Sequence, residues 1–193
     1  MRYAVLLLAA PLAGCISFGA EPPPALLSLE TRAEVPVGEV RRADGAGAVT
    51  VLSLQVPQAL ATQRVPVQST PTTIAYVPEA QWTEPPGRLF ARPLGDTIAA
   101  RTGRVVLSTA QSVADPGARL GGELRRFGLD ATTREAVVTY DAQLVRNDQT
   151  AVEKRRFEAR VPIPGEIDAP TAGLTLNDAA NQVAAQVADW VGR

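Results

Sequence analysis

The residue types that most often carry out chemistry in proteins are scarce in this 193-residue chain, which contains one cysteine and no histidine. Without histidine the chain lacks the commonest general base and the commonest metal ligand. It also contains no Gly-x-Ser-x-Gly motif, no phosphate-binding loop and no dinucleotide-binding fingerprint. The single thiol, Cys15, and the carboxylates remain as candidates, and we expect neither a metal ion nor another cofactor.

The position of Cys15 indicates that its thiol is an acceptor for lipid. The chain begins with a positive residue, Arg2, and an apolar run from Ala4 to Ala10, followed by Leu12-Ala13-Gly14-Cys15. This order is that of a secretory signal peptide, and its last four residues resemble the lipobox at which bacterial lipoproteins are cut and acylated. The apolar run is too short to span a bilayer, which takes about 20 residues. We therefore expect residues 1–14 to be removed and Cys15 to be lipidated.

The residues after Cys15 indicate where the lipid would hold the protein. Two or more acyl chains give stable membrane anchoring. Ile16 stands where bacterial lipoproteins kept in the inner membrane usually have aspartate, so by this resemblance the expected address is the outer membrane, on its periplasmic side. Residues 15–25 include Glu21-Pro22-Pro23-Pro24. This composition predicts an extended tether between the lipid and the folded domain.

Length and charge restrict the remaining residues, 26–193, to one ordinary domain. They are enough for a single domain with a sizeable core. The whole chain has 19 basic and 20 acidic residues, a net charge of −1. Since no strong overall field would attract a polyanion, we do not expect nucleic acid as a partner.

Alternating apolar and polar residues, often β-branched, predict strands along most of the domain. The expected strands are 26–29, 48–56, 65–68, 72–77, 104–108, 119–127, 134–146 and 152–163. The last is the clearest, because Phe157, Ala159 and Val161 alternate with charged residues, which indicates an antiparallel sheet with one face buried. The strand 48–56 is rich in β-branched and apolar residues and is expected to be buried on both faces.

Two helices complete the expected fold. The first follows a proline-rich turn and is either kinked at Pro93 or begins near Arg92. The second covers 175–191, with Thr175 and Asp178 forming a capping box and an apolar stripe that ends at Trp190. Strands and helices in this order predict an α+β fold, a single domain with a mainly antiparallel sheet and two helices packed on one face.

The carboxylates that could act as an acid and a base are Glu123 and Asp141, in the way that glycosidases use a pair. Both lie in predicted strands whose polar face accounts for them, so we expect the protein not to be an enzyme. Arginines and glutamates are interspersed on the same strands, which is typical of a solvated sheet surface rather than a binding site for a polyanion.

Two aromatic residues are candidates for binding a partner. Tyr76 and Trp82 flank proline-rich turns before the first helix. They could pack beneath that helix or be presented as interface anchors, since aromatic side chains dominate binding hot spots. We name both as partner-binding candidates. Trp190, by contrast, lies on a helical apolar stripe and is expected to belong to the core.

The order of several short motifs suggests a family. They are Val56-Pro57 at the end of a strand, Ile74-Ala75-Tyr76, Trp82 to Pro85, Leu94 to Ile98, Glu123 to Phe127, Arg155 to Phe157 and Asp189-Trp190-Val191. In this order and after a lipobox, they resemble the ABC-type transport auxiliary lipoproteins, the PqiC-like family. The chain departs from the family pattern at Gln81 and Pro86, where arginine and leucine are usual.

This resemblance implies a non-enzymatic periplasmic lipoprotein that works beside an Mce- or Mla-type ABC transporter moving lipids between the inner and outer membranes. The protein would dock the Mce-type component at the outer membrane, and it could do so as a homo-oligomer. Two other interpretations stay open on the residues alone. One is an assembly factor or plug for an outer-membrane barrel, and the other is a carboxylate-based periplasmic hydrolase.

Overall fold

The structure is a computed structural model that describes residues 25–34, 36–42, 47–112, 117–147 and 150–193. The signal peptide, Cys15 and the tether as far as residue 24 lie outside the described residues. Within the described ranges, neither helix is long and apolar enough to cross a bilayer.

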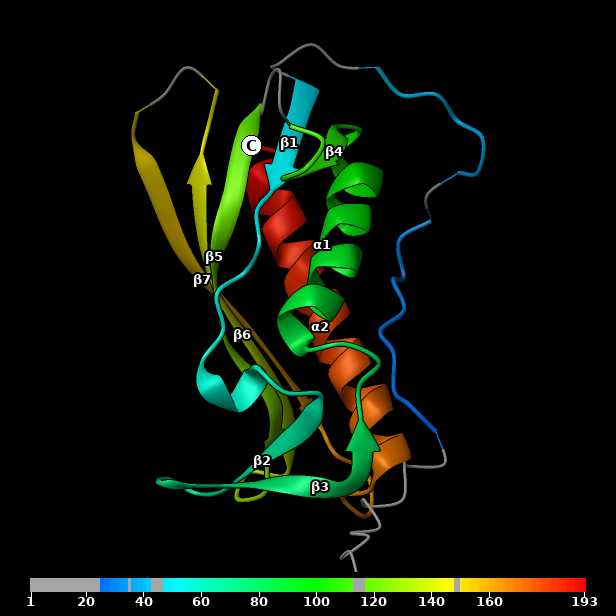
Figure 1. Cartoon of the computed structure of the whole chain (residues 1–193), viewed down its shortest axis with the longest axis vertical. Helices are drawn as coiled ribbons and strands as arrows, with labels where there is room; N and C mark the ends of the chain where they lie inside the picture. Colours follow the sequence, from blue (N-terminus) through cyan, green and yellow to red (C-terminus); the bar gives the residue numbers. More distant parts are fainter. Residues whose placement is uncertain (1–24, 35, 43–46, 113–116, 148–149) are drawn as a thin grey trace, which may run out of the picture.

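One mixed sheet of seven strands has two helices packed against one face (Figure 1). The strands are β1 (Ala48–Val51), β2 (Arg64–Thr70), β3 (Thr73–Gln81), β4 (Val105–Ser108), β5 (Ala118–Asp130), β6 (Glu135–Val145) and β7 (Val152–Pro162). The helices are α1 (Pro86–Thr102) and α2 (Ala169–Val191), with a short 3-10 turn, η2 (Gln58–Leu60). The predicted single α+β domain is confirmed.

Strand β5 joins the two parts of the sheet. Along one edge it pairs antiparallel with β6 from Arg119 to Asp130, and β6 pairs in the same way with β7. Along its other edge it pairs at one end with β1 and at the other with β2, both parallel. Strands β4 and β3 lie outside β1 and β2. The long pairings are therefore antiparallel and the parallel ones are short.

Strand β1 confirms the expected burial on both faces, because all four of its residues are buried. It ends at Val51, earlier than predicted, and only an isolated bridge between Gln55 and Glu123 continues the pairing. The strand β2 is also interior, although it contains Pro66, which has no N–H to donate. The ladder to β3 is irregular between Arg64 and Pro66, as a proline within a sheet requires.

Helix α1 begins at Pro86 and continues past Pro93, so a start near Arg92 is wrong. Proline is tolerated at the first helical position because its missing N–H would be unpaired there anyway. Glycine allows the start of the helix to lie close to the segment that follows β1. A Cβ added at Gly87 would lie 2.8 Å from Cγ1 of Val56, which is too close for any larger residue without movement.

Helix α2 begins six residues before the predicted start, so the capping box at Thr175 is also wrong. Asp168 is the N-cap, and its Oδ1 accepts a 2.9 Å hydrogen bond from the Thr171 N–H. Thr175 lies inside the helix, where its hydroxyl donates to the Thr171 carbonyl at 2.7 Å. Asp168 followed closely by Pro170 is a start signal of equal quality, and it is the one that the fold uses.

The core between the sheet and the helices contains a chain of aromatic contacts. Trp82 meets Phe127 edge-on with ring centroids 5.5 Å apart, and Phe90 contacts both Phe127 and Tyr140. The Tyr140 hydroxyl, which is buried, donates to the Gly121 carbonyl at 2.5 Å. These contacts hold α1 and the end of β3 against β5 and β6.

Trp190 is part of the core, as predicted, with 8% of its surface exposed and its ring 5.5 Å from that of Phe157. We expect Trp190→Ala to lower the free energy of unfolding by about 3 to 5 kcal/mol, because it removes buried area and leaves a cavity. Denaturant unfolding followed by circular dichroism measures the change. Val152→Ala, at a site that is 54% exposed, is the control and should change stability by less than about 0.5 kcal/mol. An unchanged midpoint for Trp190→Ala would contradict the core assignment.

Candidate functional site

The carboxylate pair named from the sequence is part of an ion-pair network. Glu123 and Asp141 are direct cross-strand neighbours on β5 and β6. The Arg125 Nη1 atom lies 3.8 Å from Glu123 and 3.5 Å from Asp141, and Arg156 forms two hydrogen bonds to Asp141, of 2.6 and 2.7 Å. The Arg156 guanidinium thereby holds the pKa of the Asp141 carboxyl below its ordinary value. A general acid needs a raised pKa, so Asp141 is poorly suited to act as one.

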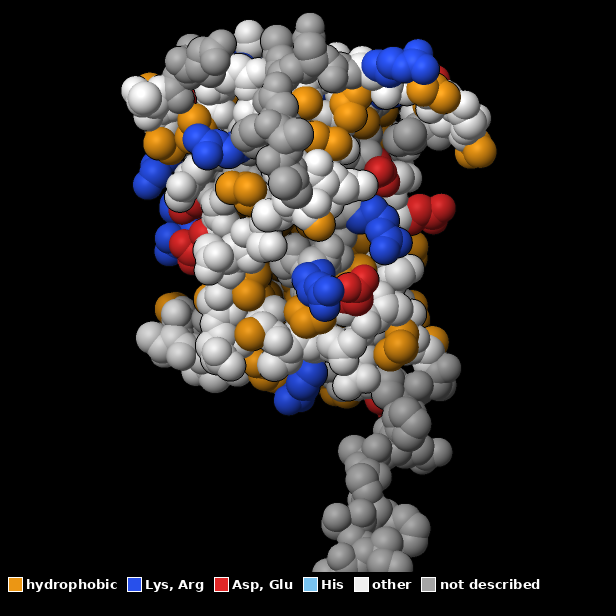
Figure 2. Space-filling view, turned by 45° about the horizontal axis from the view of Figure 1, so that its top comes forward, with side chains coloured by type: hydrophobic (Ala, Val, Ile, Leu, Met, Phe, Trp, Pro, Cys, Tyr) orange, Lys and Arg blue, Asp and Glu red, His pale blue; other side chains and the backbone are white. Residues whose placement is uncertain are grey.

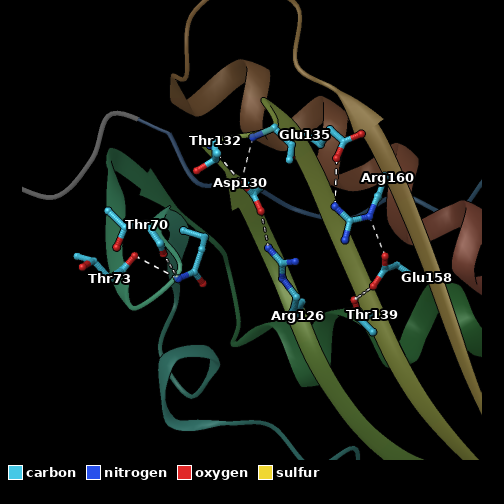
Figure 3. Close-up of polar contacts among 11 residues, drawn as sticks. Thr70, Thr73, Arg126, Asp130, Thr132, Glu135, Thr139, Glu158 and Arg160 are labelled. Carbon is cyan, nitrogen blue, oxygen red and sulfur yellow. Dashed lines mark hydrogen bonds and ion pairs between the residues drawn. The ribbon is translucent and has the colours of Figure 1, made fainter.

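The same kind of pairing continues across the uncovered face of the sheet (Figure 3). The Thr139 hydroxyl donates to Glu158 at 2.8 Å, and Arg160 bridges Glu158 and Glu135 at 2.7 and 3.1 Å. These contacts join β6 and β7, and they match the expected solvated surface of mixed charge. Within the described ranges, no group of three or more acidic, cysteine or histidine side chains could hold a metal ion.

The mixture of charges extends beyond the sheet. Figure 2 shows basic and acidic side chains scattered singly or in pairs among uncharged ones over another face of the domain. At the beginning of α1, Arg88 Nε lies 3.7 Å from Glu84 in the turn before the helix. Small apolar areas lie between these charges (Figure 2). This surface is therefore better suited to contact with a protein than to binding a polyanion.

The expectation that Trp82 could be presented to a partner needs correction. Its side chain has no exposed surface, its ring packs on Phe127, and its backbone pairs with the start of the domain. Leu27 forms a parallel bridge with Trp82, and the Leu27 carbonyl accepts a 2.9 Å hydrogen bond from the Thr83 N–H. Substitution of Trp82 would therefore act through the fold. Its Nε1 finds no hydrogen-bond partner among the described residues.

Tyr76 lies at the surface, as the alternative of an exposed interface residue requires. It is half-buried on the edge strand β3, and the Arg64 guanidinium covers its ring at 4.0 Å from the centroid. Pro66 lies opposite Tyr76, and Ile74, which is 48% exposed, lies two residues away on the same face. We call these four residues the hairpin surface.

A small pocket adjoins the hairpin surface. Its volume is about 210 Å³, and Leu60, Pro66, Ile74 and Gly128 form its apolar walls, while Arg125 and Arg126 also line it. A Cβ added at Gly128 would lie 2.5 Å from the Pro66 carbonyl oxygen, so glycine allows β2 to lie this close to β5 beside the pocket. Arg64 and Ile74 were not identified from the sequence, although the two-residue period of the strands places them beside Tyr76.

A second missed feature is the attachment of the N-terminal segment to α2. The Glu30 N–H donates to Asn177 Oδ1 at 2.9 Å, and the Arg32 N–H donates to Asn181 Oδ1 at 2.8 Å. Asn181 also donates from its Nδ2 to the Glu30 carbonyl at 2.9 Å. Two asparagines four residues apart lie on one side of a helix, which is the only sequence signal of this clamp.

A family model described as the ABC-type transport auxiliary lipoprotein component matches residues 28–188. The chain belongs to this family. The match includes every strand and most of α2, so it confirms the resemblance indicated by the order of the motifs. As a member of this family, the protein is an envelope lipoprotein and an auxiliary component of an ABC-type transport system.

Solved structures share the fold of this auxiliary lipoprotein at low identity. An uncharacterized protein is 16% identical, with a TM-score of 0.65 over 75% of this chain and 91% of that chain. Protein XCC0632 from Xanthomonas campestris, assigned to DUF330, is also 16% identical, with a TM-score of 0.70 over 86% and 94%. A PelC dodecamer from Paraburkholderia phytofirmans is more distant, at 14% identity and a TM-score of 0.47 over 76% and 90%. No curated protein matches the chain.

The lowered pKa of Asp141 makes the sheet of this lipoprotein sensitive to acid. Because the folded pKa lies below the unfolded one, the ion pair contributes its full stability above about pH 4 and loses it as the pH falls through the folded pKa. We expect Asp141→Asn to be less stable than wild type at pH 7 and to lose less stability between pH 5 and pH 2. Urea unfolding at a series of pH values measures this. Arg156→Gln should have the same effect, and wild-type acid dependence in both variants would contradict the assignment.

Proposed function

We propose that this lipoprotein is a docking component held by Cys15 at the periplasmic face of the outer membrane. There it binds the Mce-type component of an ABC transporter that moves lipids between the inner and outer membranes. The observation that carries the proposal is the family match over residues 28–188, whose description is that of a transport auxiliary lipoprotein.

The chemistry of the described residues favours docking over catalysis. Asp141 is held in its ionised form by Arg156, and the chain has no histidine to act as a base. Stable docking, in contrast, needs only a rigid body with a few exposed apolar and aromatic side chains. The domain supplies these on a sheet that is held by two long antiparallel ladders.

The hairpin surface is the part of the domain that we assign to docking. It combines an aromatic ring, an arginine stacked on that ring and an exposed isoleucine, and aromatic and arginine side chains are the types that interface hot spots favour. The adjoining pocket can accept one apolar side chain of the partner. If a second copy of the chain uses the same surface, the docking unit is a homo-oligomer.

Affinity capture of the tagged, lipidated protein from gently solubilised membranes tests the proposal as a whole. An Mce-type protein and the membrane subunit of its transporter are expected among the captured chains. Capture of an outer-membrane barrel without them would replace the proposal with the assembly-factor alternative.

The anchor is tested by Cys15→Ser. Because the acyl chains supply nearly all the membrane affinity of such a protein, the variant should accumulate as an uncleaved precursor or as a protein released from the membrane. Fractionation of outer membranes after a salt wash, with immunoblotting, measures this. Retention of a processed variant in the washed membranes would contradict lipidation at Cys15.

The docking surface is tested by Tyr76→Ala. We expect it to weaken binding of the purified Mce-type component by more than about 1 kcal/mol, since truncating an interface aromatic commonly costs that much, while the melting temperature changes little. Arg64→Ala should have a smaller effect of the same sign. The matched control is Arg155→Ala, because Arg155 likewise stacks on an aromatic ring, that of Phe157 at 5.1 Å, but on the opposite edge of the sheet. If all three variants bind the Mce-type component as tightly as the wild type does, the hairpin surface is not part of the interface.

A further inference from the structure

The end of the domain that faces the tether exposes two leucines. Leu26 is 53% exposed and Leu174, in the first turns of α2, is 75% exposed. In Figure 1 the start of the described chain, the beginning of α2 and the β2–β3 hairpin all lie at the lower end of the molecule. Large apolar side chains at such exposure are costly in water, by about 25 cal/mol for each Å² of apolar surface.

The two segments that carry these leucines contact each other and the core. Leu27 packs against Gly173, where an added Cβ would lie 3.0 Å from the Leu27 Cδ2 atom. Leu26 precedes one member of this contact and Leu174 follows the other. The Leu27 N–H also donates to the Gln81 carbonyl at 2.7 Å. The leucines therefore project from a strand-like segment and a helix, both fixed to the core.

The length of the tether limits what can cover these leucines. Ten residues separate Cys15 from Leu26, and even a fully extended chain would span only roughly 35 to 40 Å. A lipid at Cys15 would therefore keep this end of the domain close to the bilayer at all times. A surface held so near behaves as if it were present at high effective concentration.

We propose that this end of the domain rests on a zwitterionic phospholipid surface, with the Leu26 and Leu174 side chains inserted among the headgroups. This inference rests on the proposed anchor at Cys15 and adds the protein surface that meets the membrane. The exposed residues just before α2 include the carboxylates of Glu166 and Asp168, and the Arg134 guanidinium donates to the Gly165 carbonyl in the same segment. Since positive charge is not in excess here, anionic headgroups are not favoured over neutral ones.

The contact would set the orientation of the domain. Helix α2 has 23 residues, a length of about 35 Å at 1.5 Å per residue, and it runs from the membrane end to the opposite end. The hairpin surface would then lie beside the bilayer. The end of β6 and the start of β7, at the upper end in Figure 1, would lie away from it.

The test places a fluorescent probe at each end of the full-length lipidated protein. Leu174→Cys introduces the only free thiol, because Cys15, the single cysteine of the chain, is blocked by lipid. The variant is labelled with an NBD maleimide and reconstituted on phosphatidylcholine vesicles with brominated acyl chains. Val40→Cys is the matched control, since Val40 is equally exposed at 75% and belongs to a segment at the opposite end (Figure 1).

We expect brominated lipid to reduce the emission at position 174 at least twofold and to leave the emission at position 40 unchanged. If the emission changes equally at both positions in protein that floats with the vesicles, the proposed contact of this end of the domain with lipid is overturned. The anchor at Cys15 would still stand. If the protein does not float with the vesicles, both the anchor at Cys15 and the contact with lipid are overturned. If brominated lipid quenches the probe at position 174 as expected but the protein does not bind the Mce-type component, only the docking proposal is overturned.

A second measurement avoids the probe. Amide hydrogen exchange in the first turns of α2 should be slower in the wild-type protein on vesicles than in the Cys15→Ser chain in detergent-free solution. The substitution Leu174→Gln should remove at least half of this difference. Identical exchange in the wild type on vesicles and the unlipidated chain would overturn the proposal, whatever the fluorescence shows.

Discussion

The antiparallel ladder between β5 and β6 is the interaction to which every other part of the domain is attached. It pairs the strands from Arg119 opposite Val145 to Asp130 opposite Glu135. Its inner face supplies Phe127 and Tyr140, which the helices and the end of β3 bury. Its free edge, on β5, is long enough to pair with two separate strands, and so one ladder holds together two wings of the sheet that do not pair with each other.

The segment that leads to the lipid is built into this structure rather than appended to it. Leu27 pairs beside Trp82, which contacts Phe127 on the central ladder. Asn177 and Asn181 then fix the next residues along α2. Because hydrogen bonds to both β3 and α2 hold the segment, a pull on the anchor would be shared between the sheet and the helix.

The sequence predicted what depends on local periodicity and missed what depends on distant partners. The strands β5, β6 and β7 and the apolar stripe of α2 could be found because each repeats its pattern over ten or more residues. Trp82 could not be placed, since its ring packs on Phe127 and its backbone pairs with Leu27, both far away in the chain. The start of α2 was misplaced because Asp168 and Thr175 are both good caps, and only packing decides between them.

The distribution of charge over the surface explains where recognition can occur. On the uncovered face of the sheet, Asp141, Glu158 and Arg160 already satisfy one another or their neighbours across the strands. A partner that bound there would have to replace these ion pairs with others, which gains little free energy. A partner of the hairpin surface or of the exposed leucines would gain free energy by burying apolar area, which is favourable with any apolar partner. The binding specificity of the hairpin surface must therefore arise from shape and from the stacked Arg64 and Tyr76, at the end of the domain that the tether keeps nearest to the lipid.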